Sequence, residues 1–144
     1  SKSVILKVSG TVTITGDQFY ENKTYTNAAE LPQLIIIANN INIADNVANI
    51  DAWLIANNGN INTCSNFSGN LTINKCAQKL TINGPTSAKK LLLYRTAGSG
   101  TGVNSGDPAE VFNLRADTYL WSAAYAKMNN KIQSVYTTEL PPRF

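Results

Sequence analysis

Short apolar runs that alternate with polar residues recur along the first two-thirds of the chain, and they constrain its fold more than any other feature. Alternation with a period of two indicates strands that bury one face. Between Ile41 and Leu91 the runs recur about every ten residues, the spacing typical of many short strands. The runs are Val4–Leu6, Val12–Ile14, Leu34–Ile37, Ile41–Ile43, Trp53–Ile55, Ile61–Thr63, Leu71–Ile73, Leu80–Ile82 and Leu91–Leu93.

Asparagine-rich turns separate these runs. Asn39–Asn40, Asn57–Gly59, Ser68–Asn70 and Asn83–Pro85 contain residues that tolerate the left-handed backbone needed at corners. The strands are very short, and Asn repeatedly neighbours Ile, as expected if side-chain amides stack in ladders. We therefore predict a single-stranded parallel β-helix with a C-terminal capping helix, in which each coil stacks on the next. An antiparallel β-sandwich with Asn-Gly hairpin turns is the alternative.

The 144 residues have the size of one domain. We predict a single β-solenoid domain over 1–144, with strands and turns over about 1–97. A Gly-rich loop follows over 98–107, and a helical cap with a terminal strand completes the domain over 108–144.

The expected cap begins with a helix-start pattern. Asp107, Pro108 and Glu110 have the spacing of a helix start with a capping box. The helix is predicted over 108–128, with Asp117 able to cap a second turn, and its apolar residues are expected to pack on the open end or flank of the solenoid. A last strand is predicted over 132–137.

Charge and composition narrow the classes of function. The net charge is +3 and only 15% of residues are charged, without a basic stripe, so we do not expect nucleic-acid binding. Histidine is absent, which rules out Ser-His-Asp and Cys-His catalysis within this chain. Because the chain begins at Ser1 without an export signal, we expect a longer natural product whose signal or membrane anchor lies upstream.

Cys64 and Cys76 are the two cysteines, too few for a tetrahedral zinc site. They could form a disulfide that closes a short loop, with a stabilisation of roughly 3 kcal/mol. They could instead be two buried thiols of a cytosolic protein. The composition favours the disulfide and an oxidising compartment.

Acidic residues offer little for catalysis. Asp45 and Asp51 are the one close pair in the repeat region, and their spacing across a turn does not force them together. With Asn46 and Asn49 they are weak candidates for calcium ligands, although the EF-hand pattern is absent and solvated corners explain them equally well. We predict no catalytic residues, no metal site and no cofactor.

Aromatic residues are the remaining candidates for ligand contact. Tyr20 and Tyr25 flank a polar stretch over 17–27, so we expect them to be exposed and regard them as weak binding candidates. Four others could stack on sugars, but packing in the core or cap is favoured for them; they are Trp53, Tyr94, Tyr119 and Trp121. Arg95 is expected to be buried beside an acid such as Glu110.

Five segments of the chain share a pattern with known sequences: LPQLII, INIADNVANIDAWLIANNGNINTC ending at Cys64, KLTINGPTSAKKLLLYRT after Cys76, DPAEVFNL and ELPPRF. Together they resemble a family of uncharacterised surface proteins from candidate-phylum bacteria, the Saccharibacteria and their relatives. The resemblance covers most of the chain from Leu31 onward. It implies a C-terminal position in a longer, membrane-anchored protein, supports Cys64 and Cys76 acting as a pair, and transfers no activity.

These observations predict a non-catalytic structural or adhesive module that is extracellular, on a bacterial cell surface. Its expected partners are a surface polysaccharide, a protein or further copies of itself, with a membrane reached only through the upstream anchor. A self-assembling filament subunit is one alternative, and a carbohydrate-active enzyme of β-helix type is another.

Overall fold

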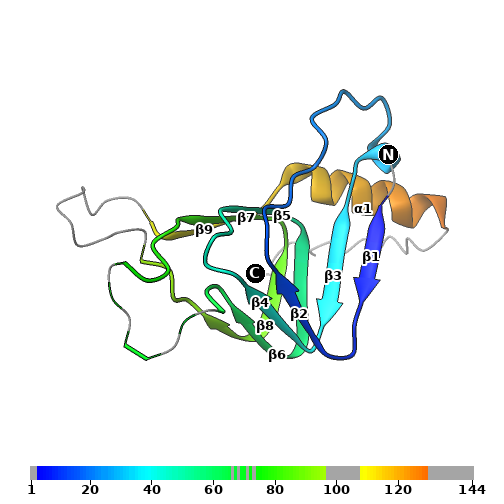
Figure 1. Cartoon of the computed structure of the whole chain (residues 1–144). Helices are drawn as coiled ribbons and strands as arrows, with labels where there is room; N and C mark the ends of the chain where they lie inside the picture. The colour runs from blue at the N-terminus through cyan, green and yellow to red at the C-terminus, as the bar shows by residue number, and fades with distance from the viewer. Residues whose placement is uncertain are drawn as a thin grey trace, which may run out of the picture.

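The computed structural model describes residues 3–65, 67, 69–70, 72, 74–96 and 108–129, which form a parallel β-helix followed by one α-helix (Figure 1). Every strand pairing in this part of the chain is parallel, which confirms the β-helix and excludes the sandwich. The elements are β1 (Val4–Lys7), β2 (Thr11–Ile14), η1 (Ala28–Glu30), β3 (Leu34–Ala38), β4 (Asn40–Ile43), β5 (Asn49–Asp51), β6 (Trp53–Asn62), β7 (Leu80–Asn83), β8 (Thr86–Leu92), β9 (Glu110–Asn113) and α1 (Ala116–Met128).

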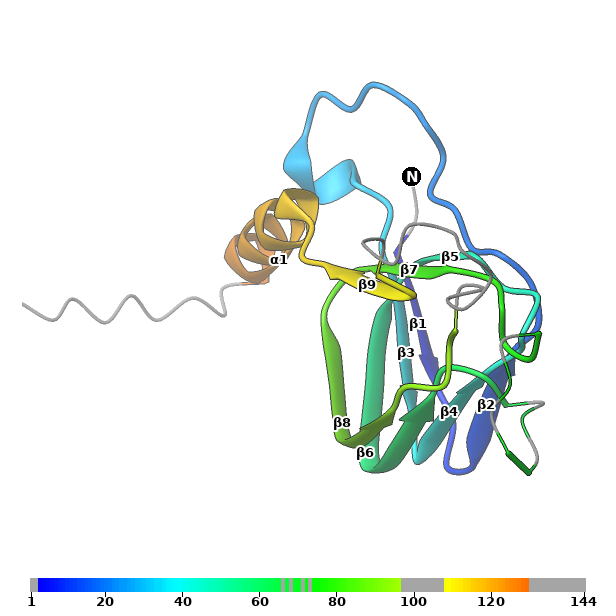
Figure 2. The ribbon, with the colours of Figure 1, turned by 90° about the vertical axis from the view of Figure 1, so that its left-hand side faces the viewer.

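The strands line three sides of the coil (Figure 2). The first side holds β1, β3 and the first parts of β6 and β8, and the second holds β2, β4 and the remainder of β6 and β8. The third side holds β5, β7 and β9. One short coil runs from Ile35 to its partner Trp53, whereas an inserted loop lengthens the coil from Ile50 to Ile82. The apolar runs that recur about every ten residues in the sequence are therefore successive strands within a coil, and a whole coil is longer than this spacing.

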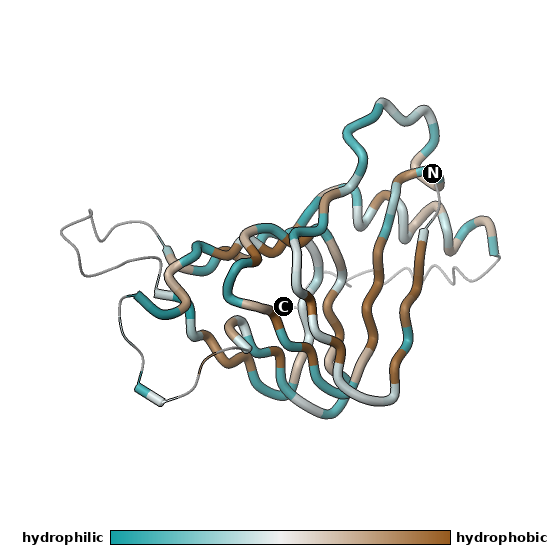
Figure 3. The backbone as a smooth tube through the Cα atoms, viewed as in Figure 1, coloured by the Kyte–Doolittle hydropathy of each residue, from teal (hydrophilic) through white to brown (hydrophobic). Residues whose placement is uncertain are grey.

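Side chains that point into the coil form the core. Ile36 lies above Leu54, Ile41 above Ile61 and Ile50 above Ile82, and all six are buried. Burial of each such side chain contributes about 1.5–3 kcal/mol. When the backbone is coloured by the hydropathy of its residues, the apolar strands β1 and β3 lie side by side at one end of the stack (Figure 3).

The outer surface of the third side carries the predicted amide ladder. The Asn83 Nδ2 donates to Asn49 Oδ1 at 3.0 Å and to Asp51 Oδ1 at 2.9 Å. The Asn113 Nδ2 in turn donates to Asn83 Oδ1 at 2.9 Å. At the following corner Gly84 has φ +155°, and a Cβ there would collide with the Ala52 carbonyl, so only glycine fits.

Arg95 fastens the corner between the second and third sides. Its guanidinium is buried and donates to the carbonyls of Thr63 and Asp45 at 2.6 Å each and of Ala44 at 2.7 Å. Burial lowers the pKa of Arg95, and the charges of Glu110 and Asp45 partly offset this. Arg95 is therefore buried as predicted, but Glu110 contacts its backbone: Glu110 Oε1 accepts the Arg95 N–H at 2.9 Å.

The predicted disulfide lies at the same corner. Cys64 and Cys76 are bonded, with their Cα atoms 6.0 Å apart, and close the loop between them. The N–H of Thr96 donates to the Cys76 carbonyl at 3.0 Å, which ties this loop to the next coil.

The C-terminal region departs from prediction in its details. The predicted helix over 108–128 begins only at Ala116, because residues 110–113 pair with β7 as strand β9. Glu110 is not a helix cap, since its Oε1 accepts from Thr63 Oγ1 at 2.6 Å. Asp117 lies in the first turn of α1, whose N-cap is Arg115. Asp107, the loop over 98–107 and the strand over 132–137 lie outside the described residues.

The predicted C-terminal helix covers a flank of the solenoid. It lies outside the corner between the third and first sides, alongside the row of strands that ends with β1 (Figures 1 and 2). Trp121 is buried against Trp53, with ring centroids 6.2 Å apart in an edge-to-face contact, so both residues pack as predicted. Among the described helices, none is long and apolar enough to cross a membrane.

Replacement of Arg95 by alanine should lower the free energy of unfolding by roughly 3–5 kcal/mol, because several buried carbonyls lose their donor. Urea denaturation measures the change. The exposed Lys89 provides the control, since Lys89→Ala should shift stability by less than about 0.5 kcal/mol. Equal stabilities of the two variants would contradict the role given to Arg95.

Reduction of the Cys64–Cys76 bond should lower the free energy of unfolding by roughly 3 kcal/mol, because the unfolded chain regains the entropy of the closed loop. The measurement is the urea midpoint with and without reductant. The double variant Cys64→Ser/Cys76→Ser should have the lowered midpoint under both conditions, and a reductant-sensitive midpoint in that variant would refute the explanation.

Candidate functional site

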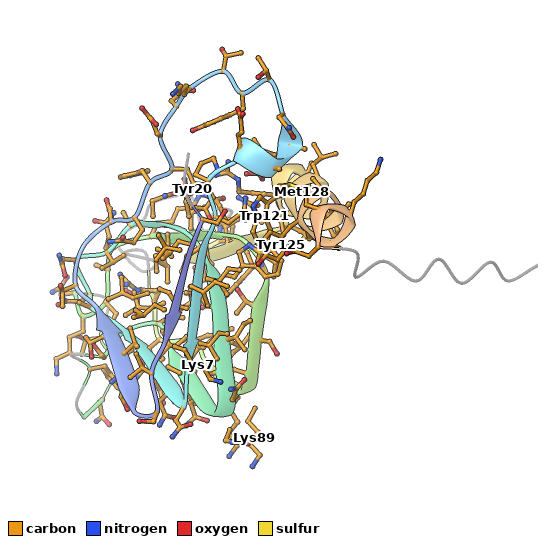
Figure 4. All side chains as sticks on the ribbon, turned by 90° about the vertical axis from the view of Figure 1, so that its right-hand side faces the viewer. Lys7, Tyr20, Lys89, Trp121, Tyr125 and Met128 are labelled. Carbon is orange, nitrogen blue, oxygen red and sulfur yellow. A yellow bond between two sulfur atoms is a disulfide. The ribbon has the colours of Figure 1, made fainter. Side chains whose placement is uncertain are left out.

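A cleft of about 360 Å³ lies between the chain that connects β2 to β3 and the start of α1. We call this connection, residues 15–33, the β2–β3 segment, and the hollow the Tyr20 cleft. Figure 4 shows Tyr20 at the same corner of the molecule as α1, while Lys7 and Lys89 lie at the opposite corner. The aromatic and charged residues that line the cleft include Tyr20, Lys23, Tyr25, Asp51, Arg115 and Asp117.

Asp51 joins the parts that meet at the cleft. Its Oδ1 accepts the side-chain amides of Asn49 at 3.0 Å and Asn83 at 2.9 Å. Its Oδ2 accepts the backbone N–H of Tyr20 at 3.0 Å and lies 3.1 Å from Arg115 Nη1. These contacts fill all four acceptor positions of the carboxylate. One side chain thereby connects two coils, the β2–β3 segment and the helix start.

The surroundings of Asp51 favour its charged form. Burial raises the pKa of this carboxyl, but the Tyr20 N–H, the amides of Asn83 and Asn49 and the charge of Arg115 outweigh burial, and the pKa is lowered overall. An ionised carboxylate with four donors cannot act as a general acid. It cannot become a nucleophile without losing contacts that hold the fold together. Asp51 is therefore a positioning group in this cleft.

Arg115 connects the helix start to the cleft wall. Its Nε donates to Asp117 Oδ1 at 2.9 Å, and its guanidinium carbon lies 5.0 Å from the centre of the Tyr20 ring. Burial lowers the pKa of Arg115, but Asp117 and then Asp51 and Tyr20 outweigh burial and raise it. The guanidinium therefore remains charged and held against an aromatic ring, in a cation–π contact.

Tyr20 and Tyr25 lie together in the wall of the cleft, and both are half-buried, so the prediction that they are exposed is wrong. The Tyr20 hydroxyl accepts the Leu34 N–H at 3.0 Å, which fixes the ring beside β3. Burial raises the pKa of Tyr20, against the opposing effects of the Leu34 N–H and Arg115. The Tyr25 hydroxyl donates to the Glu21 carbonyl at 3.3 Å.

A smaller, mainly apolar recess of about 230 Å³ adjoins the cleft and shares Tyr20 and Asp51 with it. Gln33 lines this recess and is 2% exposed. Its Oε1 accepts the Trp53 indole N–H at 2.6 Å, which fixes the orientation of the amide. The Gln33 Nε2 has no hydrogen-bond partner among the described residues.

The calcium candidates are not brought together as a site. Asp45 lies in the turn before β5, whereas Asp51 is the last residue of β5 and its acceptor positions are filled. In the part of the chain that the structure describes, no three Cys, Asp or Glu residues form a cluster that could hold a metal ion.

Comparison of this chain with protein-family models, curated proteins and solved structures finds no match.

Asp51→Asn should make the free energy of unfolding less dependent on pH in the acidic range. Because the native pKa of Asp51 is lowered, the wild type has this stabilisation in full above the unfolded pKa of about 3.9 and loses it as pH falls through the native pKa. The variant should be roughly 1–3 kcal/mol less stable at neutral pH, and the gap should narrow below pH of about 4. Urea denaturation across pH measures this gap.

Glu30→Gln is the control for that experiment, because Glu30 is exposed and lies outside the cleft. Its gap to the wild type should stay close to zero at every pH. A constant gap for Asp51→Asn would contradict the account of Asp51.

Proposed function

We propose that this chain is a non-catalytic extracellular module that binds a surface polysaccharide in the Tyr20 cleft and holds the cleft on a rigid solenoid at a bacterial cell surface. The observation that carries the proposal is the composition of the cleft, in which aromatic rings lie beside charged and amide groups in a fixed arrangement. Aromatic rings pack on the apolar faces of sugars, and planar polar groups bind hydroxyls.

The state of the acidic groups favours binding over catalysis. Glycoside hydrolysis needs a carboxylic acid that donates a proton and a second carboxylate that acts as base or nucleophile. The cleft is lined by three acids, Glu21, Asp51 and Asp117. Asp51 is ionised and fully engaged, and Asp117 accepts from Arg115, so two of the three carboxylates are held in contacts with the protein. The cleft thus offers hydrogen-bonding and stacking surfaces, which suit an adhesive module.

The disulfide supports an extracellular location. Structural disulfides such as the Cys64–Cys76 bond persist in oxidising compartments. The resemblance to surface proteins of candidate-phylum bacteria supports the same location, with the solenoid as a spacer between the cell and its ligand.

Tyr25→Ala should weaken binding to cell-surface polysaccharide by about tenfold in Kd, equivalent to roughly 1.4 kcal/mol, because one stacking wall of the cleft is lost. Isothermal titration with purified cell-wall polysaccharide fractions gives the Kd. Tyr119→Ala is the matched control, since Tyr119 is exposed on α1 and does not line the cleft. Its Kd should equal that of the wild type.

Both variants should keep the melting temperature close to that of the wild type, which separates binding from folding. Absence of polysaccharide binding by the wild type, or equal loss in the two tyrosine variants, would reject the proposed function.

A further inference from the structure

The core of the solenoid is uncovered at both ends of the described coils. At the first end, Val4 and Leu6 point inward, above Leu34 and Ile36, yet Leu6 is 42% exposed, and β3 is the one described strand that pairs with β1. At the last end, Leu91 continues the inward row of Ile41 and Ile61 and is 44% exposed. Leu93 and Phe112 are exposed at this end as well.

Both ends also present unpaired strand edges. Among the described strands, β1 pairs only with β3 and β2 only with β4, while β8 pairs only with β6 and β9 only with β7. α1 lies along a flank, to one side of β8 and β9 (Figure 2). A free edge of this kind is a template for another parallel strand.

The two ends match each other in register. Leu6, Ile36, Leu54 and Thr86 occupy one position in successive coils, so the next coil would place a Leu6 on Thr86. On the second side the same rule places Val12, which begins the row of Ile41, Ile61 and Leu91, on Leu91. The first coil of a second copy therefore continues the core rows.

Charges do not oppose this match. In the same register Lys7 of a second copy lies on Ser87, and its Thr11 lies on Lys90. No lysine faces a lysine directly at these positions, so the repulsion of like charges directly opposite each other does not arise.

We propose that copies of this chain stack head to tail, with the first part of β8 of one copy pairing with β1 of the next and the remainder of β8 pairing with β2. The contact buries the open core rows and satisfies backbone groups on both edges. Because the two surfaces differ, the contact is heterologous and does not close, so stacking extends into filaments. The Tyr20 cleft lies on the flank and would repeat along such a filament. The inference is independent of the ligand proposed for that cleft.

Two single variants test the polarity of the contact. Leu6→Lys blocks the first end and Leu91→Lys blocks the last end, and both sites are exposed enough to tolerate the change. Sedimentation velocity from micromolar to millimolar protein should show the wild type growing beyond twice the monomer mass. Each variant alone should stay a monomer, whereas an equimolar mixture should form a dimer, because each partner keeps one intact end.

Leu120→Lys is the matched control, since Leu120 is 58% exposed on α1 and lies in none of the strands that would pair; it should assemble like the wild type. Circular dichroism and melting of each variant verify folding. A wild type that stays monomeric at every concentration overturns the proposal, as does association of either variant alone. A chain that assembles only after removal of residues 130–144 also overturns it, because the end would then be occupied by the chain's own terminus.

Discussion

Ile50 lies above Ile82, and Asp51 above Asn83, because β5 and β7 pair in parallel register. This register sends the isoleucines into the core and brings the polar pair to the outer surface. There Asp51 accepts from two amides of the coils and still has an oxygen for the Tyr20 N–H and Arg115. The start of the β2–β3 segment is held by the bridge between Gln18 and Ile50 and by Asp17, whose Oδ1 accepts the N–H groups of Ala48 and Asn49. The Asp51 carboxylate adds the contacts to Tyr20 and to the start of α1, and Trp121 packs the helix against Trp53. The cleft is a consequence of coil register.

Two corners of the coil differ in how their polar groups are arranged. At the corner of Arg95, irregular loops leave carbonyl groups without strand partners inside the protein, and one buried guanidinium satisfies several of them. The disulfide holds the same corner covalently. At the corner of Asp51 the charged groups are partly exposed and lie around an open cleft. Buried hydrogen bonds and the disulfide are thus concentrated at one corner, and the open cleft lies at the other.

The sequence predicted the parts of the fold that depend on local pattern. Three local features predicted the β-helix and its amide ladder: the period-two runs, the Asn-rich corners and the repeated Asn beside Ile. They were sufficient because each coil of a solenoid needs the same kinds of residue at equivalent positions. Residues 110–113 were misassigned for the same reason, since the Asp-Pro-x-Glu pattern is a local helix signal. Pairing with β7 overrides that signal, and β propensity depends strongly on such context.

The cleft was only half predictable. Tyr20 and Tyr25 stood out as aromatics in a polar stretch, but Arg115 and Asp117 lie far along the chain, and only the coil stack brings them close. Their proximity to Tyr20 follows from tertiary structure, which single-sequence patterns do not encode. The half-burial of the two tyrosines follows from the same long-range contact.

Amide hydrogen exchange of Tyr20, followed by NMR in the wild type and in Asp51→Asn, tests most directly whether Asp51 organises the cleft. Its N–H is the donor that ties the β2–β3 segment to Asp51. The account predicts strong protection in the wild type and its loss in Asp51→Asn, while the amides of β6 stay protected in both. A Tyr20 amide that exchanges as fast as the exposed Lys23 amide in the wild type, or that stays protected in the variant, would contradict it.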